Sequence, residues 1–246
     1  MDAEVYARMA ELDSEHWWFA ARRSILASVI RRVVRLPAKA PILEIGCGTG
    51  HNLEMLGQFG RVEATELNDS ARKLAAKRLG RKVHSAALPD LSMFKPASFD
   101  MVALLDVLEH INDDDAALGA IKALLKPGGA LLVTIPANRW MWSAHDVSHH
   151  HHRRYSKQEI ARLARAKGFK IDLLSPFNTL LFPLIAVARI AGKLTGRQAA
   201  DDSMPPMPLN SALKSIFALE APLVGRMPMP FGVSLLAVLR RPVDPK

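Results

Sequence analysis

The chain has 246 residues, about half of them hydrophobic, and a formal net charge of +9. This length suits one α/β domain with an insertion rather than two full domains, and the single cysteine, Cys47, excludes an internal disulfide. A basic surface suits nucleic acid, an anionic membrane or an anionic small molecule, and does not choose among them.

Residues 1–40 have helical spacing of their apolar side chains. The first residues carry acids and lack an apolar centre, so they do not predict a signal peptide. An aromatic cluster that contains Trp17 and Trp18 precedes two arginines. Such a cluster can wall a substrate site or seal a helix onto the core, because aromatic side chains also contribute heavily to cores. We expect an N-terminal helical cap, with Trp17 and Trp18 as candidate substrate contacts.

Residues 41–50 read P-I-L-E-I-G-C-G-T-G. A short apolar run that glycines stop at once is typical of a buried parallel strand, and residues 51–59 have helical spacing. Alternate glycines tolerate positive φ and let a ligand approach the backbone. The order strand, glycine turn and helix predicts a ligand pocket at the carboxyl end of a strand.

The spacing G-x-G-x-G differs from the G-x-G-x-x-G of dinucleotide loops, and Glu44 would repel a pyrophosphate but attract an ammonium. The string E-I-G-C-G-T-G resembles motif I of the class I S-adenosylmethionine (SAM)-dependent methyltransferases. The resemblance implies an α/β, Rossmann-like sheet of seven strands, six parallel and the seventh antiparallel, with helices on both faces. It also implies that this loop contacts SAM through Glu44, Gly46, Cys47, Gly48 and Gly50.

Residues 61–67, R-V-E-A-T-E-L, predict a second strand that ends at Glu66. An acid at this place in nucleotide-binding α/β folds accepts hydrogen bonds from the ribose hydroxyls. The position matches motif II of the same family, so we expect SAM contacts from Glu66 and Leu67. A third strand is expected at residues 82–89, where the acid that relatives use to hold adenine is absent.

Residues 98–111, S-F-D-M-V-A-L-L-D-V-L-E-H-I, predict a fourth strand with Asp106 at its carboxyl end. The segment resembles motif IV, which makes Asp106 a candidate for both cofactor binding and catalysis. The Asn/Asp-Pro-Pro-aromatic motif of DNA amino-methyltransferases is absent, which argues against nucleobase methylation. A helix is expected at residues 113–125 and a fifth strand at residues 130–136.

A histidine-rich segment, N-R-W-M-W-S-A-H-D-V-S-H-H-H-H-R-R-Y, follows the fifth strand at residues 138–155. Histidine titrates near neutral pH and can take the proton of an acceptor hydroxyl, so His145 and His152 are candidate bases; the other reading is a solvated loop. Its H-R-R-Y string resembles that of a bacterial, type 11-like methyltransferase branch. Arginine forks bind anions, and the candidate substrate residues are Arg153, Arg154 and Tyr155.

A metal site is a further hypothesis for Asp106, Glu109 and His110. Their D-x-x-E-H spacing is similar to the E-x-x-E-H of ubiquinone-pathway O-methyltransferases and of small-RNA 2′-O-methyltransferases, which bind a divalent ion there. Carboxylates with imidazole suit magnesium, manganese or zinc, and a later histidine could complete the set. Metal-free relatives carry the same V-L-E-H string, and aspartate has a shorter reach, so we predict no metal and keep these residues as candidates.

Residues 156–167 begin with the capping box S-K-Q-E, and a sixth strand follows at residues 169–175. Residues 173–188 carry no charge but are too short for a spanning helix. With basic residues beyond them, they suit a membrane-interface segment or a wall for a lipid-like substrate; a helix buried on the domain or in a dimer interface is the alternative. A final strand is expected at residues 232–240.

The sequence therefore predicts a SAM-dependent methyltransferase that acts on an oxygen of a small or lipid-like acceptor. Two alternatives stay open: an RNA 2′-O-methyltransferase with a divalent metal, although no RNA-binding module is recognisable, and a non-catalytic SAM-binding protein. We expect a cytoplasmic protein with peripheral contact at the inner membrane face; the sequence leaves the oligomeric state open. The expected divisions are a cap at 1–40, a SAM-binding core at 41–175, an apolar insertion at 176–231, and a final strand with tail at 232–246.

Overall fold

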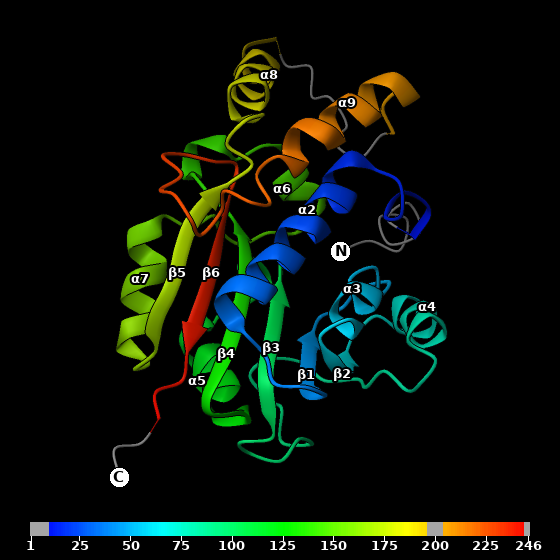
Figure 1. Cartoon of the computed structure of the whole chain (residues 1–246). Helices are drawn as coiled ribbons and strands as arrows, with labels where there is room; N and C mark the ends of the chain where they lie inside the picture. Colours follow the sequence, from blue (N-terminus) through cyan, green and yellow to red (C-terminus); the bar gives the residue numbers. More distant parts are fainter. Residues whose placement is uncertain (1–9, 196–203, 244–246) are drawn as a thin grey trace.

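The computed structural model describes residues 10–195 and 204–243. They form a central sheet with helices on both faces (Figure 1), as expected. The strand order across the sheet is β2-β1-β3-β4-β6-β5. The strands are β1 (Ala40–Ile45), β2 (Gly60–Thr65), β3 (Phe99–Leu105), β4 (Leu125–Pro136), β5 (Lys170–Phe177) and β6 (Ser234–Arg240).

The helices occupy the two faces of the sheet and the end toward which the parallel strands point (Figure 1). The α-helices are α2 (Trp17–Val29), α3 (Leu53–Gly57), α4 (Asp69–Leu79), α5 (Asp114–Leu124), α6 (Ala144–Ser148), α7 (Lys157–Ala166), α8 (Phe182–Thr195) and α9 (Met207–Ala218). The shorter turns are the π-helix η1 (Ile30–Val34) and the 3₁₀ helices η2 (Leu108–His110) and η3 (Arg139–Met141).

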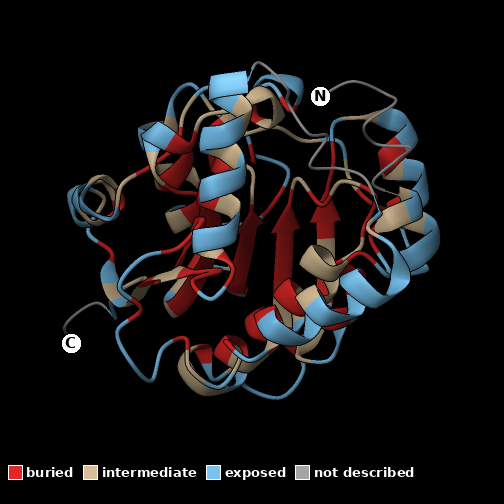
Figure 2. Cartoon of the chain, turned by 90° about the horizontal axis from the view of Figure 1, so that it is seen from above, coloured by how far each residue is buried: buried red, intermediate tan, exposed pale blue. Residues whose placement is uncertain are grey.

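Apolar side chains of each strand alternate between two cores. In β1, Ile42 joins the core under α2 and α3, whereas Leu43 joins the core under α5 and α7. Successive side chains of a strand point to opposite faces, so a strand covered on both faces needs a continuous apolar run. Seen from above, the central strands are therefore buried and the helices carry most of the exposed surface (Figure 2).

The last strand, β6, lies between β4 and β5 and runs antiparallel to both. Ala237 pairs with Val133 on one side and with Leu174 on the other. This confirms the expected place of the antiparallel strand. The segment between β5 and β6 contains α8 and α9. Both helices lie at the end of the molecule toward which the parallel strands point.

The expected strand count was wrong: the described residues form a six-stranded sheet. The segment expected as the third strand, residues 82–89, is joined to the sheet by one bridge, between His84 and Thr65. Two backbone hydrogen bonds hold His84 against β2. The chain then turns at Ala87 and Asp90, and Pro89 has no N–H to offer a ladder, so pairing stops.

The N-terminal segment is more than a cover. Ile25, Leu26 and Val29 of α2 are fully buried against the sheet. The amino end of the same helix is joined to α9, because the backbone N–H of Trp17 donates to the side-chain oxygen of Asn210 at 2.8 Å. Residues 1–9 of the expected cap lie outside the described residues.

Candidate active site

A cavity of about 520 Å³ lies at the carboxyl ends of the central strands. Its volume falls within the range of ordinary ligand pockets. The walls come from α2, the glycine loop after β1, the ends of β2 and β3, and the segment of α6 and α8. The lining includes these residues selected from the sequence: Trp17, Trp18, Gly46, Cys47, Gly48, Glu66, Leu67, Asp106, Glu109, His110, His145 and Arg154.

The three glycines after β1 all have positive φ, but they serve different purposes. A Cβ on Gly46 would lie 2.8 Å from a methyl group of Val107, and one on Gly50 would lie 2.7 Å from Leu53. Those two glycines let the loop pack. A Cβ on Gly48 would meet nothing within 4 Å, so the absence of a side chain there leaves room in the cavity for a ligand.

Glu66 follows β2 and holds the glycine loop in place. Its carboxylate accepts hydrogen bonds from the backbone N–H of Gly48 and from that of Asn68, each at 2.8 Å. A carboxylate has about four lone-pair sites, so these bonds leave capacity for hydroxyl groups of a ligand. The acid is thus fixed beside the loop, where the sequence places a ribose contact.

Glu44 does not reach the cavity, contrary to its expected contact with the cofactor. The side chain is 1% exposed and accepts a hydrogen bond from the amide of Asn52 at 2.8 Å. Burial raises the pKa of Glu44 to about 7, since lost hydration outweighs the Asn52 hydrogen bond and the charge of Arg22. Asn52 lines the cavity instead. Glu44 therefore orients Asn52 without lining the cavity itself. Gly50, which was also expected to contact the cofactor, does not line the cavity either.

Asp106 is held by a residue that the sequence analysis did not select. Arg22 of α2 is 2% exposed, and its Nη2 lies 2.6 Å from a carboxylate oxygen of Asp106. The same nitrogen donates to the hydroxyl of Thr134 at 2.7 Å. The contact joins α2 to the ends of β3 and β4 inside the cavity. The sequence did contain a signal for this role, because Arg22 lies among the apolar positions on one side of the expected helix.

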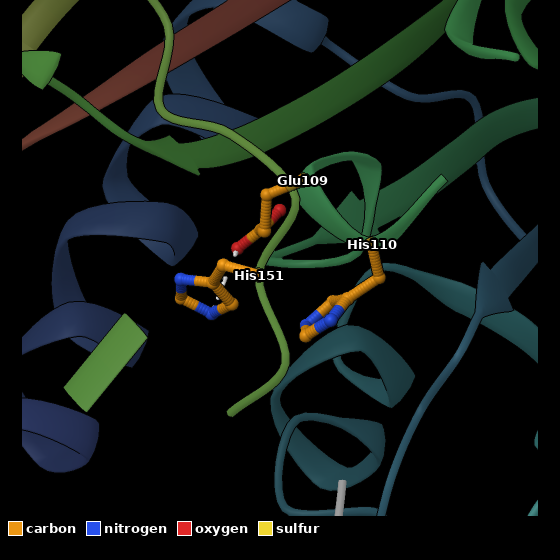
Figure 3. A group of neighbouring side chains, drawn as sticks. All are labelled: Glu109, His110 and His151. Carbon is orange, nitrogen blue, oxygen red and sulfur yellow. Dashed lines mark ion pairs between the residues drawn. The ribbon is translucent and has the colours of Figure 1, made fainter. Parts of the chain in front are cut away.

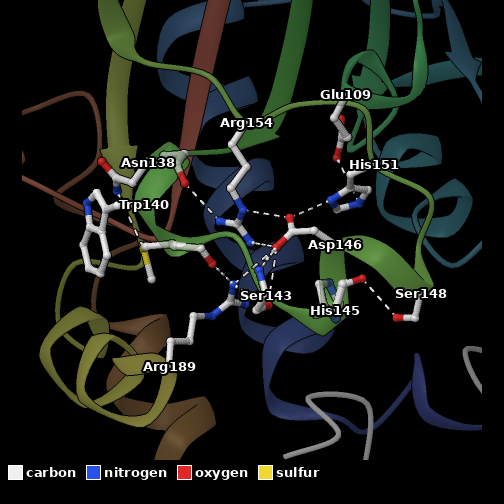
Figure 4. A network of polar contacts seen from close by, with 12 residues as sticks. Glu109, Asn138, Trp140, Ser143, His145, Asp146, Ser148, His151, Arg154 and Arg189 are labelled. Atoms are coloured by element: carbon white, nitrogen blue, oxygen red, sulfur yellow. Dashed lines mark hydrogen bonds and ion pairs between the residues drawn. The ribbon is translucent and has the colours of Figure 1, made fainter. Parts of the chain in front are cut away.

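The histidine-rich segment is organised by Asp146, which is fully buried (Figure 4). Arg154 makes a two-pronged contact with it, at 2.7 and 2.9 Å, and His151 Nδ1 lies 2.9 Å away. Although burial alone would raise it, the hydrogen bonds from His151 and Arg154 hold the pKa of Asp146 well below its usual range. Arg154 lines the cavity, but its charge is already matched.

Three other residues proposed from this segment, Arg153, Tyr155 and His152, do not line the cavity. Arg153 and Tyr155 both contact the carboxylate of Asp114, at 3.1 and 2.9 Å, and Tyr155 is buried. His152 is exposed and is absent from the lining. His145, at the start of α6, does line the cavity, and its ring centroid lies 4.1 Å from that of His149.

Glu109, His110 and His151 form the group suited to a metal ion (Figure 3). One possible ligand atom from each lies within 4.8 Å of the other two. Glu109 is completely buried, and neither carboxylate oxygen has a hydrogen-bond partner among the described residues. Asp106, which the sequence analysis included among the candidate ligands, is paired with Arg22 instead. The structure brings His151 into the group in its place.

The chemistry of this set fits a divalent cation. One carboxylate with two imidazoles suits such ions, and a histidine ligand is commonly fixed by a carboxylate on its other nitrogen. Asp146 occupies that position on His151. Burial, followed by the charge of Asp106, raises the pKa of Glu109 well above its ordinary value, as expected for a fully buried acid beside another carboxylate.

Comparison with known sequences gives one family. A model of the methyltransferase domain matches residues 18–174. The ubiquinone biosynthesis O-methyltransferase of Thiobacillus denitrificans is 27% identical over 201 residues, covering 71% of this chain and 86% of that protein. The protein of the same name from Idiomarina loihiensis is 31% identical over 148 residues, covering 52% of this chain and 61% of its own length.

Solved structures have the same fold. A chain of the complex between the Haloferax volcanii Trm112 methyltransferase activator and a methyltransferase superposes with a TM-score of 0.64 at 16% identity, covering 98% of this chain and 99% of that one. Phosphoethanolamine N-methyltransferase 2 of Haemonchus contortus, in complex with SAM, gives a TM-score of 0.59 at 20% identity, covering 89% of this chain and 52% of that one.

The Asp146 network gives a stability prediction. Asp146→Ala leaves the buried charge of Arg154 without its partner, and removing one member of a buried ion pair costs about 3–5 kcal/mol. Urea unfolding should show a loss of free energy of that size. Asp69→Ala, which removes an exposed partner of Lys73, is the control and should change little. Equal stabilities for the two variants would contradict the assigned role of Asp146.

Proposed function

Because the chain belongs to the class I SAM-dependent methyltransferases, we propose that it transfers the cofactor's methyl group to an oxygen of a small, lipid-like acceptor. SAM is the cofactor of this family. The relatives named for O-methylation in ubiquinone biosynthesis support an oxygen acceptor. The apolar part of the cavity wall, with Trp17, Trp18, Ile185 and Val233, carries the proposal of a lipid-like acceptor.

The glycine loop and the end of β2 would hold the cofactor. When bound, SAM supplies an electrophilic methyl carbon on a sulfonium. The backbone of Gly46, Cys47 and Gly48 would bear its methionine part, and Glu66 would accept hydrogen bonds from its ribose hydroxyls. Burial raises the pKa of the Cys47 thiol well above its ordinary value, so this side chain stays protonated and acts as a small apolar group.

His145 is the proposed base, because it lines the cavity and His152 does not. Its imidazole would take the proton of the acceptor hydroxyl, so that the acceptor oxygen gains the methyl group as the sulfonium becomes a thioether. Asp106 would bound the same space while Arg22 holds its carboxylate. The main contribution of the protein is to position the reactants in line, which alone can provide a large part of a rate enhancement.

Transfer of labelled methyl from SAM to defined acceptors tests this proposal. We expect label in phenols, with better turnover when the ring carries an alkyl tail, and the product should resist mild base as an ether does. Base-labile label would indicate a carboxylate acceptor, and label in RNA would support the RNA alternative. SAM binding without transfer to any acceptor would contradict the proposal and support the alternative of a non-catalytic SAM-binding protein.

The glycine loop gives the second prediction. Gly48→Val should lower SAM affinity about tenfold, because a side chain would project into the ligand space. Isothermal titration calorimetry measures the change. The matched control is Gly80→Val: Gly80 also has positive φ and also has nothing within 4 Å of an added Cβ, but it lies after α4, outside the cavity lining. Unchanged affinity in Gly48→Val would place the cofactor elsewhere.

We also propose that Glu109, His110 and His151 hold a divalent cation, which would supply a Lewis acid beside the acceptor. Manganese or zinc at about a hundredfold excess over its dissociation constant should raise the melting temperature by roughly 5 °C. Glu109→Gln keeps the shape of the side chain and should abolish that rise. His152→Gln, which alters an exposed neighbour, should keep it. No rise in the unmodified protein with magnesium, manganese or zinc would contradict the site.

A further inference from the structure

Helix α8 has its polarity reversed relative to an ordinary surface helix, whose apolar stripe faces the core. The side chain of Arg189 turns toward the protein and donates hydrogen bonds to Met141 and Ser143. Lys193 is exposed, but its amino group reaches back to the carbonyl oxygen of Trp140. Ala186 is the one buried residue that α8 contributes. Its large apolar side chains face outward, with exposed fractions of 60% for Leu184, 65% for Val187, 48% for Ile190 and 82% for Leu194.

Exposed apolar side chains also occur on α9 and on the segments that flank the two helices. Both helices lie at the end of the molecule toward which the parallel strands point (Figure 1). We call the exposed apolar side chains of this segment the α8–α9 surface. Besides the four side chains of α8, it comprises Leu180, Met204, Met207, Leu209, Ile216, Leu219, Met227 and Phe231. Exposed apolar side chains in such number at one end of a molecule indicate an interaction site.

Within the described part of this segment, the exposed charges are basic. Within residues 178–195 and 204–233, the single acidic residue is Glu220. It is fully buried, and its carboxylate accepts hydrogen bonds from the backbone N–H groups of residues 178–180. The exposed charged side chains there are Lys193, Lys214 and Arg226. A self-complementary contact made through the described residues of this segment would bring these basic side chains together.

We propose that the α8–α9 surface docks the protein on an anionic lipid bilayer. Exposed apolar side chains beside basic residues match the two contributions to interfacial binding, which are apolar burial and attraction to anionic lipids. None of the described helices is both long and apolar enough to cross a membrane, so the contact is peripheral. The reversed polarity of α8 then has a physical reason, because lipid would cover its apolar face.

Docking would also bring the bilayer close to the cavity. Ile185 and Arg189, on the inner side of α8, line the cavity, while Leu184 and Val187 face outward. Helix α8 is thus the wall between the lipid surface and the acceptor space. Delivery of a lipid-like acceptor past this helix rests on the proposed function, whereas docking does not.

Vesicle flotation of the full chain tests docking without SAM or an acceptor. The protein should float with phosphatidylcholine vesicles that contain phosphatidylglycerol and much less with phosphatidylcholine alone. Val187→Asp should abolish flotation. The matched control is Val243→Asp, because Val243 is similarly exposed, at 68%, in the C-terminal tail. Lys214→Glu should weaken binding about fivefold or more, as expected for a basic residue at an anionic surface.

Three results would overturn docking. The first is that the unmodified protein does not float with anionic vesicles. The second is that Val187→Asp floats as well as Val243→Asp. The third is a dimer in light scattering that Val187→Asp dissociates, without flotation, which would assign the surface to a second copy. Methyl transfer to a water-soluble acceptor separates this proposal from the proposed function: Val187→Asp should retain it, since Val187 does not line the cavity.

Discussion

The buried contact between Arg22 and Asp106 is the interaction on which the site depends. A guanidinium that is 2% exposed needs a matching charge, because an unpaired charge in the interior is strongly unfavourable. Asp106, at the turn after β3, provides that charge, and Thr134 on β4 accepts a second hydrogen bond from the same nitrogen. The first well-packed helix of the chain is thereby fixed across the ends of two strands, and the cavity is closed on the side of α2.

The parts that the sequence predicted are those fixed by local chemistry. Positive φ and close packing require glycine at positions 46 and 50, so the loop after β1 could be read directly. The acid after β2, Glu66, follows from where parallel strands end, and the capping box of Ser156 and Glu159 begins α7 as expected. In each case the determining contacts lie within a few residues or within one strand–turn–helix unit.

The parts that the sequence did not predict depend on contacts between distant segments. Whether an arginine faces a ligand or an internal acid is set by its neighbours in space. Arg154 binds the carboxylate of Asp146, and Arg153 binds that of Asp114. The same holds for His151, which joins Glu109 only because the loop after β4 folds back over η2. The expected third strand did not form for a related reason. Its segment pairs with β2 only at His84, and the chain turns away at Ala87.

The insertion between β5 and β6 connects these observations to the acceptor. Helix α9 adds the fully buried Phe217 to the core under α2 and holds the amino end of α2 through Asn210. Helix α8 contributes to the cavity wall. Stability alone does not explain a helix that turns Arg189 inward and its two leucines, Leu184 and Leu194, outward. An acceptor with an apolar tail would enter a cavity walled by aromatic side chains, and a lipid surface on the outer face of α8 would cover what the fold leaves exposed. In this proposal the same helix would face both environments, so the position of α8 would link membrane docking to the choice of acceptor.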